Sequence, residues 1–230
     1  MINGIMNINR FQQNNINNNN HINFGGRKIA VTKPVIDGIE KEIAIYKINN
    51  KDWDFIRQIT NKIDLAQLLP SKVNSKNFPI WQDIINLASN CVGDIKKASA
   101  YIAIHDKKPC GIIVTSKNRK QGCVNLFATW PIKIETKVKK AGSTLFTSFL
   151  DVARRKNLQK ISLEPVINGP TDAVGFYKAH GLDFPDKKGS LMTMNKQKIK
   201  ETLDIKTKEL NFQKLENQPY VSIKSVVDFE

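Results

Sequence analysis

The stretch TDAVGFYKAHGLDF, from Thr171 to Phe184, carries much of the information about this fold. It predicts a short helix over DAVGFYKAHG that contains an adjacent Phe176–Tyr177 pair and stops at Gly181, because glycine is favoured just after a helix. An aromatic pair on a short helix is usually part of the core. These residues alone support a packing role and a functional role equally well, so the neighbouring segments have to be considered.

Regular strand and helix patterns flank this helix on both sides. Upstream, EIAIYKI predicts a strand, and two helices follow, one capped by Asn50 and one ended by Gly93. The runs ASAYIAIHD, PCGIIVTSK and CVNLFATW predict an antiparallel meander, since short turn-rich links join them. An amphipathic helix follows Gly142, and KISLEPV and GSLMTMNKQ predict two further strands. Because a strand–helix–strand crossover makes two strands parallel, we expect an α/β fold with one mixed, mostly antiparallel sheet flanked by helices.

The 230 residues are enough for a single domain with tails. Residues 1–26 are rich in asparagine and low in complexity, which predicts a disordered tail. We expect residues 27–41 to be a linker or a partly extended segment, and residues 42–196 to form the domain. Residues 197–230 are expected to be a charged C-terminal extension, partly helical over KQKIKETLDI. A role for the two tails in assembly or attachment is a further hypothesis.

The chain is strongly basic, with 36 lysine and arginine residues against 21 aspartate and glutamate residues and a net charge of +15. This excess suits an anionic partner, such as a phosphorylated cofactor, a nucleic acid, an acidic protein or a membrane surface. The basic clusters lack interleaved aromatic residues for base stacking, so a solvated surface is preferred over a nucleic-acid face. There is no apolar run of about 18 residues and no signal-peptide pattern, so no membrane span is expected.

The three cysteines and three histidines form no recognisable metal-binding motif, and no metal is expected. Cys110 and Cys123 lie in apolar, strand-like runs, where small core residues are more common than nucleophiles. An odd number of cysteines without paired spacing is typical of reduced thiols, so we expect a cytoplasmic protein.

The join between CVNLFATW and the long helix is the most informative place for chemistry. The loop KVKKAGST leads directly into a helix, whose first N–H groups have no intrahelical acceptor and whose dipole makes that end positive. Gly142 would allow close approach of a ligand, Ser143 and Thr144 can donate hydroxyl hydrogen bonds, and three lysines flank the turn. These features predict a cradle for a phosphate or pyrophosphate. Neither a P-loop nor a dinucleotide glycine motif is present.

The order of elements resembles the GNAT superfamily of N-acetyltransferases over roughly Glu42 to Lys196. In that family, a loop of the pattern [RQ]xxGx[GA] follows the fourth strand and binds the pyrophosphate of acetyl-CoA through backbone amides. A fifth strand then leads to a helix of the pattern AxxFYxxxGF. The residues that match this second motif are Ala173, Phe176, Tyr177, Gly181 and, in place of the last phenylalanine, Leu182.

The loop departs from the family's pattern, and two alignments are open. In one, Lys137 replaces the arginine or glutamine, Lys140 replaces the first glycine and Gly142 keeps the second. In the other, Lys139 comes first, Gly142 is the first glycine and Thr144 replaces the second. Backbone binding tolerates such changes if the turn survives, and extra lysines would attract phosphates. A side chain at a position that requires a positive φ would instead close the cradle.

The resemblance implies acetyl-CoA as co-substrate and a set of residues that bind it. Backbone groups of Phe127 to Thr129 would pair with the pantetheine arm. The family's asparagine before the short helix is Pro170 here, and Asn168 is the candidate to replace it. The full set of implied cofactor-binding residues is Phe127, Ala128, Thr129, Lys137, Val138, Lys139, Lys140, Ala141, Gly142, Ser143, Thr144 and Asn168.

The resemblance also gives Tyr177 the role of general acid, with Phe176 packing the helix on the sheet. A departing thiolate needs a proton, and a phenol with a pKa near ~10 can supply one. The attacking amine must be neutral, so a base is needed, directly or through water. The family often has a glutamate on its fourth strand, whereas CVNLFATW has none. Glu164 on the next strand is the candidate base, and a surface or salt-bridged glutamate is the alternative.

Together these features predict an N-acyltransferase that moves an acetyl group from acetyl-CoA to a primary amine in a direct ternary complex. The alternative is a catalytically inactive GNAT-like binding module that uses its basic surface for nucleic acid or an acidic protein. The degenerate loop and the missing carboxylate favour that alternative, whereas Tyr177 does not. Nothing in the sequence names the amine, which is either a small molecule or a protein.

Overall fold

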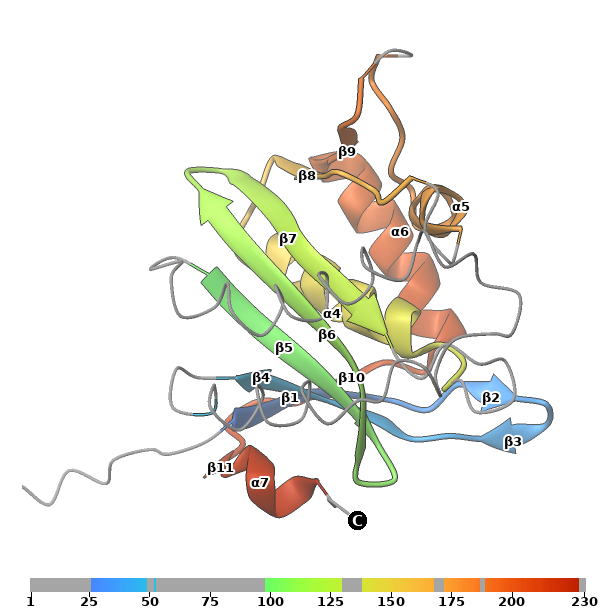
Figure 1. The fold of residues 1–230 in the computed structure, drawn as a ribbon, viewed down its shortest axis with the longest axis vertical. Helices are drawn as coiled ribbons and strands as arrows, with labels where there is room; N and C mark the ends of the chain where they lie inside the picture. The colour runs from blue at the N-terminus through green and yellow to red at the C-terminus, as the bar shows by residue number, and fades with distance from the viewer. Residues whose placement is uncertain are drawn as a thin grey trace, which may run out of the picture.

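The computed structural model describes residues 26–48, 52, 98–129, 138–167, 172–186 and 189–227. Over these residues the chain forms one large sheet with helices packed against it (Figure 1). The N-terminal residues 1–25 and the two helices expected between Asn50 and Gly93 lie outside the described residues. None of the helices in the described ranges is long and apolar enough to cross a membrane.

The large sheet has nine strands in the order β10-β1-β4-β5-β6-β7-β8-β9, with β11 also paired to β1. Only β7 and β8 are parallel, and the other pairs are antiparallel. The predicted mixed, mostly antiparallel sheet is therefore confirmed. The strands are β1 Gly26–Thr32, β4 Ile43–Ile48, β5 Ala98–His105, β6 Lys108–Asn118, β7 Gln121–Thr129, β8 Lys160–Leu163, β9 Met192–Asn195, β10 Gln213–Lys214 and β11 Tyr220–Val221.

The meander of β5, β6 and β7 follows from its turns. Asp106 and Lys107 join β5 to β6 with φ values of 48° and 58°, as the tight hairpin turn with two left-handed residues requires. Arg119 and Lys120 join β6 to β7, with Arg119 at φ 50°. Each of these turns reverses the direction of the chain within two residues. The antiparallel order expected from the short links is therefore confirmed.

Two helices connect the strands on the other half of the sheet. Helix α4, Ala141–Arg155, lies between β7 and β8 in the chain and packs on the sheet through Leu145, Phe146 and Leu150, all fully buried. This crossover makes β7 and β8 parallel, as predicted. Helix α5, Ala173–Ala179, ends before Gly181, which has φ +84°. The predicted glycine stop is confirmed.

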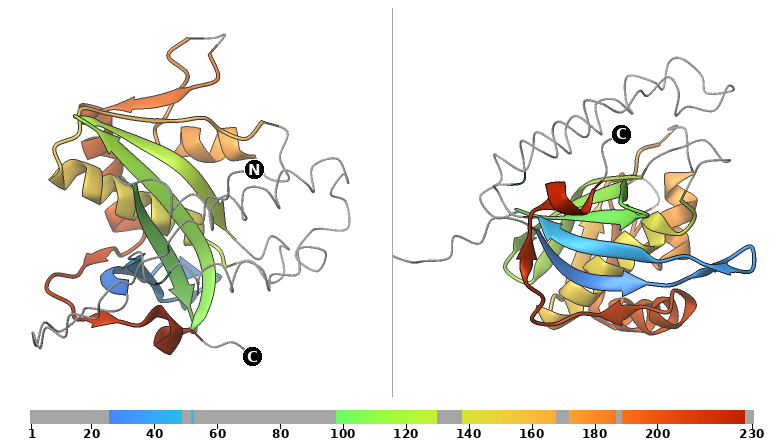
Figure 2. Two further views of the ribbon diagram at one scale, coloured as in Figure 1. Left: turned by 60° about the vertical axis from the view of Figure 1, so that its left-hand side comes forward. Right: turned by 90° about the horizontal axis from the view of Figure 1, so that it is seen from below.

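Two segments that the sequence analysis placed outside the domain belong to the same structure. Residues 27–41 contain β1 and a hairpin of β2, Val35–Ile36, and β3, Ile39–Glu40. The charged C-terminal segment forms α6, Lys196–Glu209, whose Ile199 and Leu203 join the core, and a short α7, Ile223–Val226. Figure 2 shows this segment wrapping beside β1 and α4. The boundary at residue 196 was missed because α6 buries only a narrow stripe among many exposed charges.

Candidate active site

Among the described strands, one edge of β7 has a partner over only its first three residues. Strand β8 pairs with β7 from Gln121 to Cys123, whereas β7 continues to Thr129 with β6 as its partner on the other side. From Val124 onward, alternate residues therefore present N–H and C=O groups that no described strand pairs with on that side. Figure 1 shows β7 and β8 starting side by side and diverging. Such an edge can bind an extended ligand by strand-like hydrogen bonds.

The N-terminus of α4 lies beside the end of this edge. A Cβ atom on Gly142 would be 3.5 Å from Cζ of Phe127 on β7. The N–H of Thr144 donates to the carbonyl of Lys140, whereas the N–H groups of Gly142 and Ser143 have no acceptor in the described part of the chain. No side chain caps the helix. Two free donors at the positive end of a helix can bind an anion.

The two described lysines of the loop are held in ion pairs with distant carboxylates. Nζ of Lys139 is 2.7 Å from Asp37, in the β2–β3 turn, and Nζ of Lys140 is 2.6 Å from Glu209, at the end of α6. The hydrogen bond from Lys140 is the main reason why the pKa of Glu209 falls to about 2. These carboxylates offset part of the attraction that the sequence analysis expected the lysines to add for phosphates.

Lys140 has a left-handed backbone conformation, with φ 70°. This region favours glycine, and another residue there costs about 1–2 kcal/mol. The conformation agrees with the alignment in which Lys140 takes the place of the loop's first glycine. The side chain of Lys140 extends toward Glu209, with which it forms an ion pair, and the N–H groups of Gly142 and Ser143 have no acceptor among the described residues.

Two of the residues expected to bind the cofactor face the core instead. Thr144 is fully buried, and its hydroxyl lies 2.9 Å from that of Thr32 on β1. Ala141 is also buried, and its N–H donates to the carbonyl of Val138 at 3.3 Å. The expected hydroxyl donation from Thr144 was therefore wrong. A helix start rotates its residues by about 100° each, so only some of them can face a ligand.

The space beside Gly142 is bounded by two aromatic rings. A Cβ atom there would meet the ring of Phe176 at 3.4 Å and the ring of Phe127 at 3.5 Å, which are ordinary contact distances. A methyl group therefore fits at this position, and a larger side chain would extend toward the two rings.

Tyr177 lies where α5, α4 and β7 meet. Its ring centroid is 6.2 Å from that of Phe127 and 5.9 Å from that of Phe146. The residue is 7% exposed, and burial raises the pKa of its phenol. Phe176 packs α5 on the sheet, as predicted, with its ring 5.6 Å from Phe127. Phe127, Tyr177 and the start of α4 therefore form one cluster.

The candidate base, Glu164, is not part of this cluster. Glu164 is exposed after the end of β8, and its carboxylate accepts a hydrogen bond from the hydroxyl of Ser190 at 3.3 Å. This is the surface glutamate that the sequence analysis gave as the alternative. Two other expected site residues, Lys137 and Asn168, lie outside the described residues.

His180 is a buried member of the cluster that the sequence analysis did not single out. It is 3% exposed, and its ring centroid is 4.2 Å from that of Phe176. Its Nδ1 lies 2.8 Å from the carbonyl of Phe176, whereas Nε2 has no partner among the described residues. Burial is the main reason why its pKa falls to about 4. Its position four residues after Phe176, on the same helical face, was the available signal.

We expect the free energy of unfolding to fall as the pH is lowered from 7 to 4. The pKa of His180 is about 4 in the folded protein and near 6.5 in the unfolded chain, so the unfolded chain takes up one more proton in this range. Stability is therefore complete above pH 6.5 and is lost toward pH 4, with a slope of up to about 1.4 kcal/mol per pH unit. Urea titrations of wild type and His180→Phe at several pH values measure this slope.

The control for this experiment is Ile205→Ala, which replaces a non-titrating, exposed side chain on α6. This variant should keep the wild-type slope, whereas His180→Phe should lose about one proton's contribution. Identical slopes in wild type and His180→Phe would contradict the burial of a neutral imidazole.

No protein-family model matches the chain, and no curated protein matches it. Several solved structures that are similar to it are acetyltransferases. One is a PaiA N-acetyltransferase from Thermoplasma acidophilum in complex with coenzyme A, with 18% identity and a TM-score of 0.43 over 66% of this chain and 98% of that chain. Another is a GNAT-family acetyltransferase from Staphylococcus aureus, with 16% identity, a TM-score of 0.43 and the same coverage. A third, from Streptococcus agalactiae, has 22% identity and a TM-score of 0.46, again over 66% and 98%.

Proposed function

We propose that this protein is an acyl-CoA-dependent N-acyltransferase that moves an acetyl group from acetyl-CoA to a primary amine. The proposal rests mainly on one arrangement: the open edge of β7 leads to the free N–H groups of Gly142 and Ser143, with Tyr177 packed beside the same strand. The three features come from different parts of the chain, and each suits a different part of one ligand.

The parts of acetyl-CoA match these features in order. The pantetheine arm contains amides, which can pair with backbone groups of β7 between Phe127 and Thr129 in the manner of a neighbouring strand. The pyrophosphate carries the negative charge that the N–H groups of Gly142 and Ser143 favour. The binding is through the backbone, so it does not depend on the ion-paired side chains of Lys139 and Lys140.

The reaction proceeds in a ternary complex of protein, acetyl-CoA and amine. The neutral amine attacks the thioester carbonyl, so that a C–N bond forms and the C–S bond breaks. The amine proton passes to water, and the departing thiolate takes a proton from the hydroxyl of Tyr177, which is then reprotonated from solvent. A phenol is protonated across the neutral range, so the proton is available when the thiolate forms. Burial raises the pKa of Tyr177, which makes it a weaker acid than a free phenol.

Transfer through a covalent cysteine intermediate is disfavoured at Cys110. This thiol is 1% exposed, and burial raises its pKa to about 12. A nucleophilic cysteine needs the opposite, an accessible thiol with a lowered pKa. A direct attack by the amine requires no such residue.

Calorimetry with acetyl-CoA tests the proposal, using Gly142→Val and Gly142→Ala as a matched pair. Wild type should bind, and Gly142→Ala should bind within a few-fold because its Cβ fits at ordinary contact distance. Gly142→Val should lose about 10-fold or more in affinity, because its branches meet the rings of Phe176 and Phe127 and displace the start of α4.

Thermal unfolding of both variants separates loss of the site from loss of the fold. If folded wild-type protein does not bind acetyl-CoA, the proposed function is wrong. If Gly142→Val binds as wild type does, the start of α4 is not the phosphate site.

A further inference from the structure

A group of exposed lysine and arginine residues lies away from the start of α4, around the β6–β7 turn. Strand β7 begins beside the β6–β7 turn and ends beside α4, so the two ends of this strand are separate regions. Exposed cations gather around its beginning, from four parts of the chain. We call this set the basic end, and its members are Lys47, Lys117, Arg119, Lys120, Lys156 and Lys160.

Backbone pairing brings these segments together. Lys160 on β8 is the register partner of Gln121 on β7, directly after the turn that holds Arg119 and Lys120. The N–H of Gln159 donates to the carbonyl of Lys120 at 2.7 Å, which ties the turn to the start of β8. In Figure 1 the β6–β7 turn lies at the upper left of the sheet and β4 lies below it, with β5 between them.

No carboxylate in the described part of the chain neutralises the basic end. None of its six members forms an ion pair with another described residue, whereas nearby Arg154 and Arg155 share Asp151. Burial lowers the pKa of Lys156, and the charges of Lys47 and Lys117 lower it further. Unpaired like charges repel one another and raise the local potential, which favours an anion from solution.

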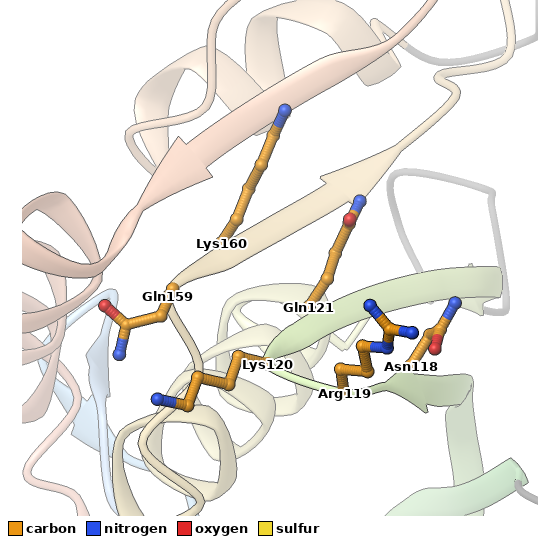
Figure 3. Close-up of a pocket in the computed structure, with 6 residues that line it drawn as sticks. All are labelled: Asn118, Arg119, Lys120, Gln121, Gln159 and Lys160. Atoms are coloured by element: carbon orange, nitrogen blue, oxygen red, sulfur yellow. The ribbon is translucent and has the colours of Figure 1, made fainter.

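A shallow hollow of about 430 Å³ lies beside the β6–β7 turn and includes three members of the basic end, Arg119, Lys120 and Lys160 (Figure 3). Figure 3 shows Gln121 and Lys160 standing side by side on neighbouring strands, with Arg119 and Asn118 beyond them. Three cations and three amides form the lining, with no carboxylate, aromatic or apolar side chain. The lining residues are Asn118, Arg119, Lys120, Gln121, Gln159 and Lys160.

We propose that the basic end binds the sugar–phosphate backbone of a double-stranded nucleic acid. Lysine, arginine, asparagine and glutamine are the side chains that contact phosphate and sugar. An acidic protein would need an apolar centre in the interface, and an anionic membrane would favour apolar anchors, which the hollow lacks. Aromatic side chains that stack on single-stranded bases are also missing from its lining, so a duplex fits better.

The basic end presents cations on both faces of the sheet. Lys160 points away from α4, because the next residue along β8, Ile161, belongs to the core under α4. Lys47 points to the α4 side, since its register partner Tyr101 lies in that core. Contacts of such cations with phosphates carry little sequence preference.

The experiment compares two triple variants of the full chain with equal changes in charge. In the first, Arg119, Lys120 and Lys160 are each replaced by glutamate. In the second, three exposed lysines elsewhere without an ion pair to a described residue are replaced in the same way: Lys108, Lys208 and Lys224. Binding of a labelled duplex of about 20 base pairs, as DNA and as RNA, is followed by fluorescence anisotropy at several salt concentrations.

Wild type should bind a duplex, with affinity that falls steeply with salt. The first variant should lose about 10-fold or more and show a shallower salt dependence, by about 0.9 in log–log slope for each phosphate contact removed. The second variant should lose much less. Acetyl-CoA binding should be unchanged in the first variant, so this proposal and the proposed function succeed or fail separately.

Three results would overturn the proposal. One is the absence of duplex binding by wild type at about 0.1 M salt. Another is an equal loss in both triple variants, which would mean that net charge alone attracts the duplex. The last is tighter binding of polyglutamate or of phosphatidylserine vesicles than of the duplex.

Discussion

Replacing Tyr177 with phenylalanine is expected to lower the rate of acyl transfer about 10²-fold or more, because the departing thiolate loses its proton donor. The ring remains, so the contacts with Phe127 and Phe146 are kept and the fold should be intact. Acetyl-CoA binding should change little, since the hydroxyl acts on the thiolate as it forms. Thiol release over a panel of amines measures the rate, and calorimetry measures the binding.

Tyr101→Phe is the matched control for this variant. Tyr101 on β5 is 2% exposed, and burial raises its pKa as it does for Tyr177. Loss of its hydroxyl should leave the rate near that of wild type. A Tyr177→Phe variant that turns over as wild type does would remove the proposed acid role, and the function would then depend on another donor.

Replacing Phe146 with alanine is expected to lower the free energy of unfolding by about 3–5 kcal/mol, through lost burial and the cavity left behind. Phe146 is fully buried on α4, and its ring contacts aromatic rings from three other elements or turns. The nearest centroid is that of His180, at 5.4 Å, and that of Tyr177 is at 5.9 Å. Urea or thermal unfolding measures the loss.

Two further variants serve as controls for this prediction. Phe146→Leu should lose less than Phe146→Ala, because it keeps most of the apolar volume. Ile205→Ala on α6 removes a side chain that is 63% exposed and should stay within about 0.5 kcal/mol of wild type. A loss below about 1 kcal/mol in Phe146→Ala would show that the aromatic cluster is not a tightly packed part of the core.

The parts of the fold that the sequence predicted well depend on local signals. Strand-like apolar runs and the short links between them predicted β5, β6 and β7, and helical spacing predicted α4. The short helix and its glycine stop were also found, because capping and a positive φ involve only neighbouring residues. The crossover then followed from chain order, since a helix between adjacent strands makes them parallel.

The candidate site was predicted only in part, because its details depend on contacts between distant segments. The loop before α4 was located, but the hydroxyl of Thr144 points to Thr32, which is 112 positions away. The partner of Lys139 is 102 positions away, and that of Lys140 is 69 positions away. No local pattern encodes such pairs.

The amino-acid pattern alone was sufficient for strands β4 to β9, helices α4 and α5 and the mixed sheet, because hydrophobic periodicity and turn chemistry act over a few residues. The tertiary structure was needed for the place of α6 in the core, the ion pairs of Lys139 and Lys140, the burial of His180 and the gathering of the basic end. Each of these depends on which surfaces come together through space, where burial and charge interactions act regardless of separation along the chain.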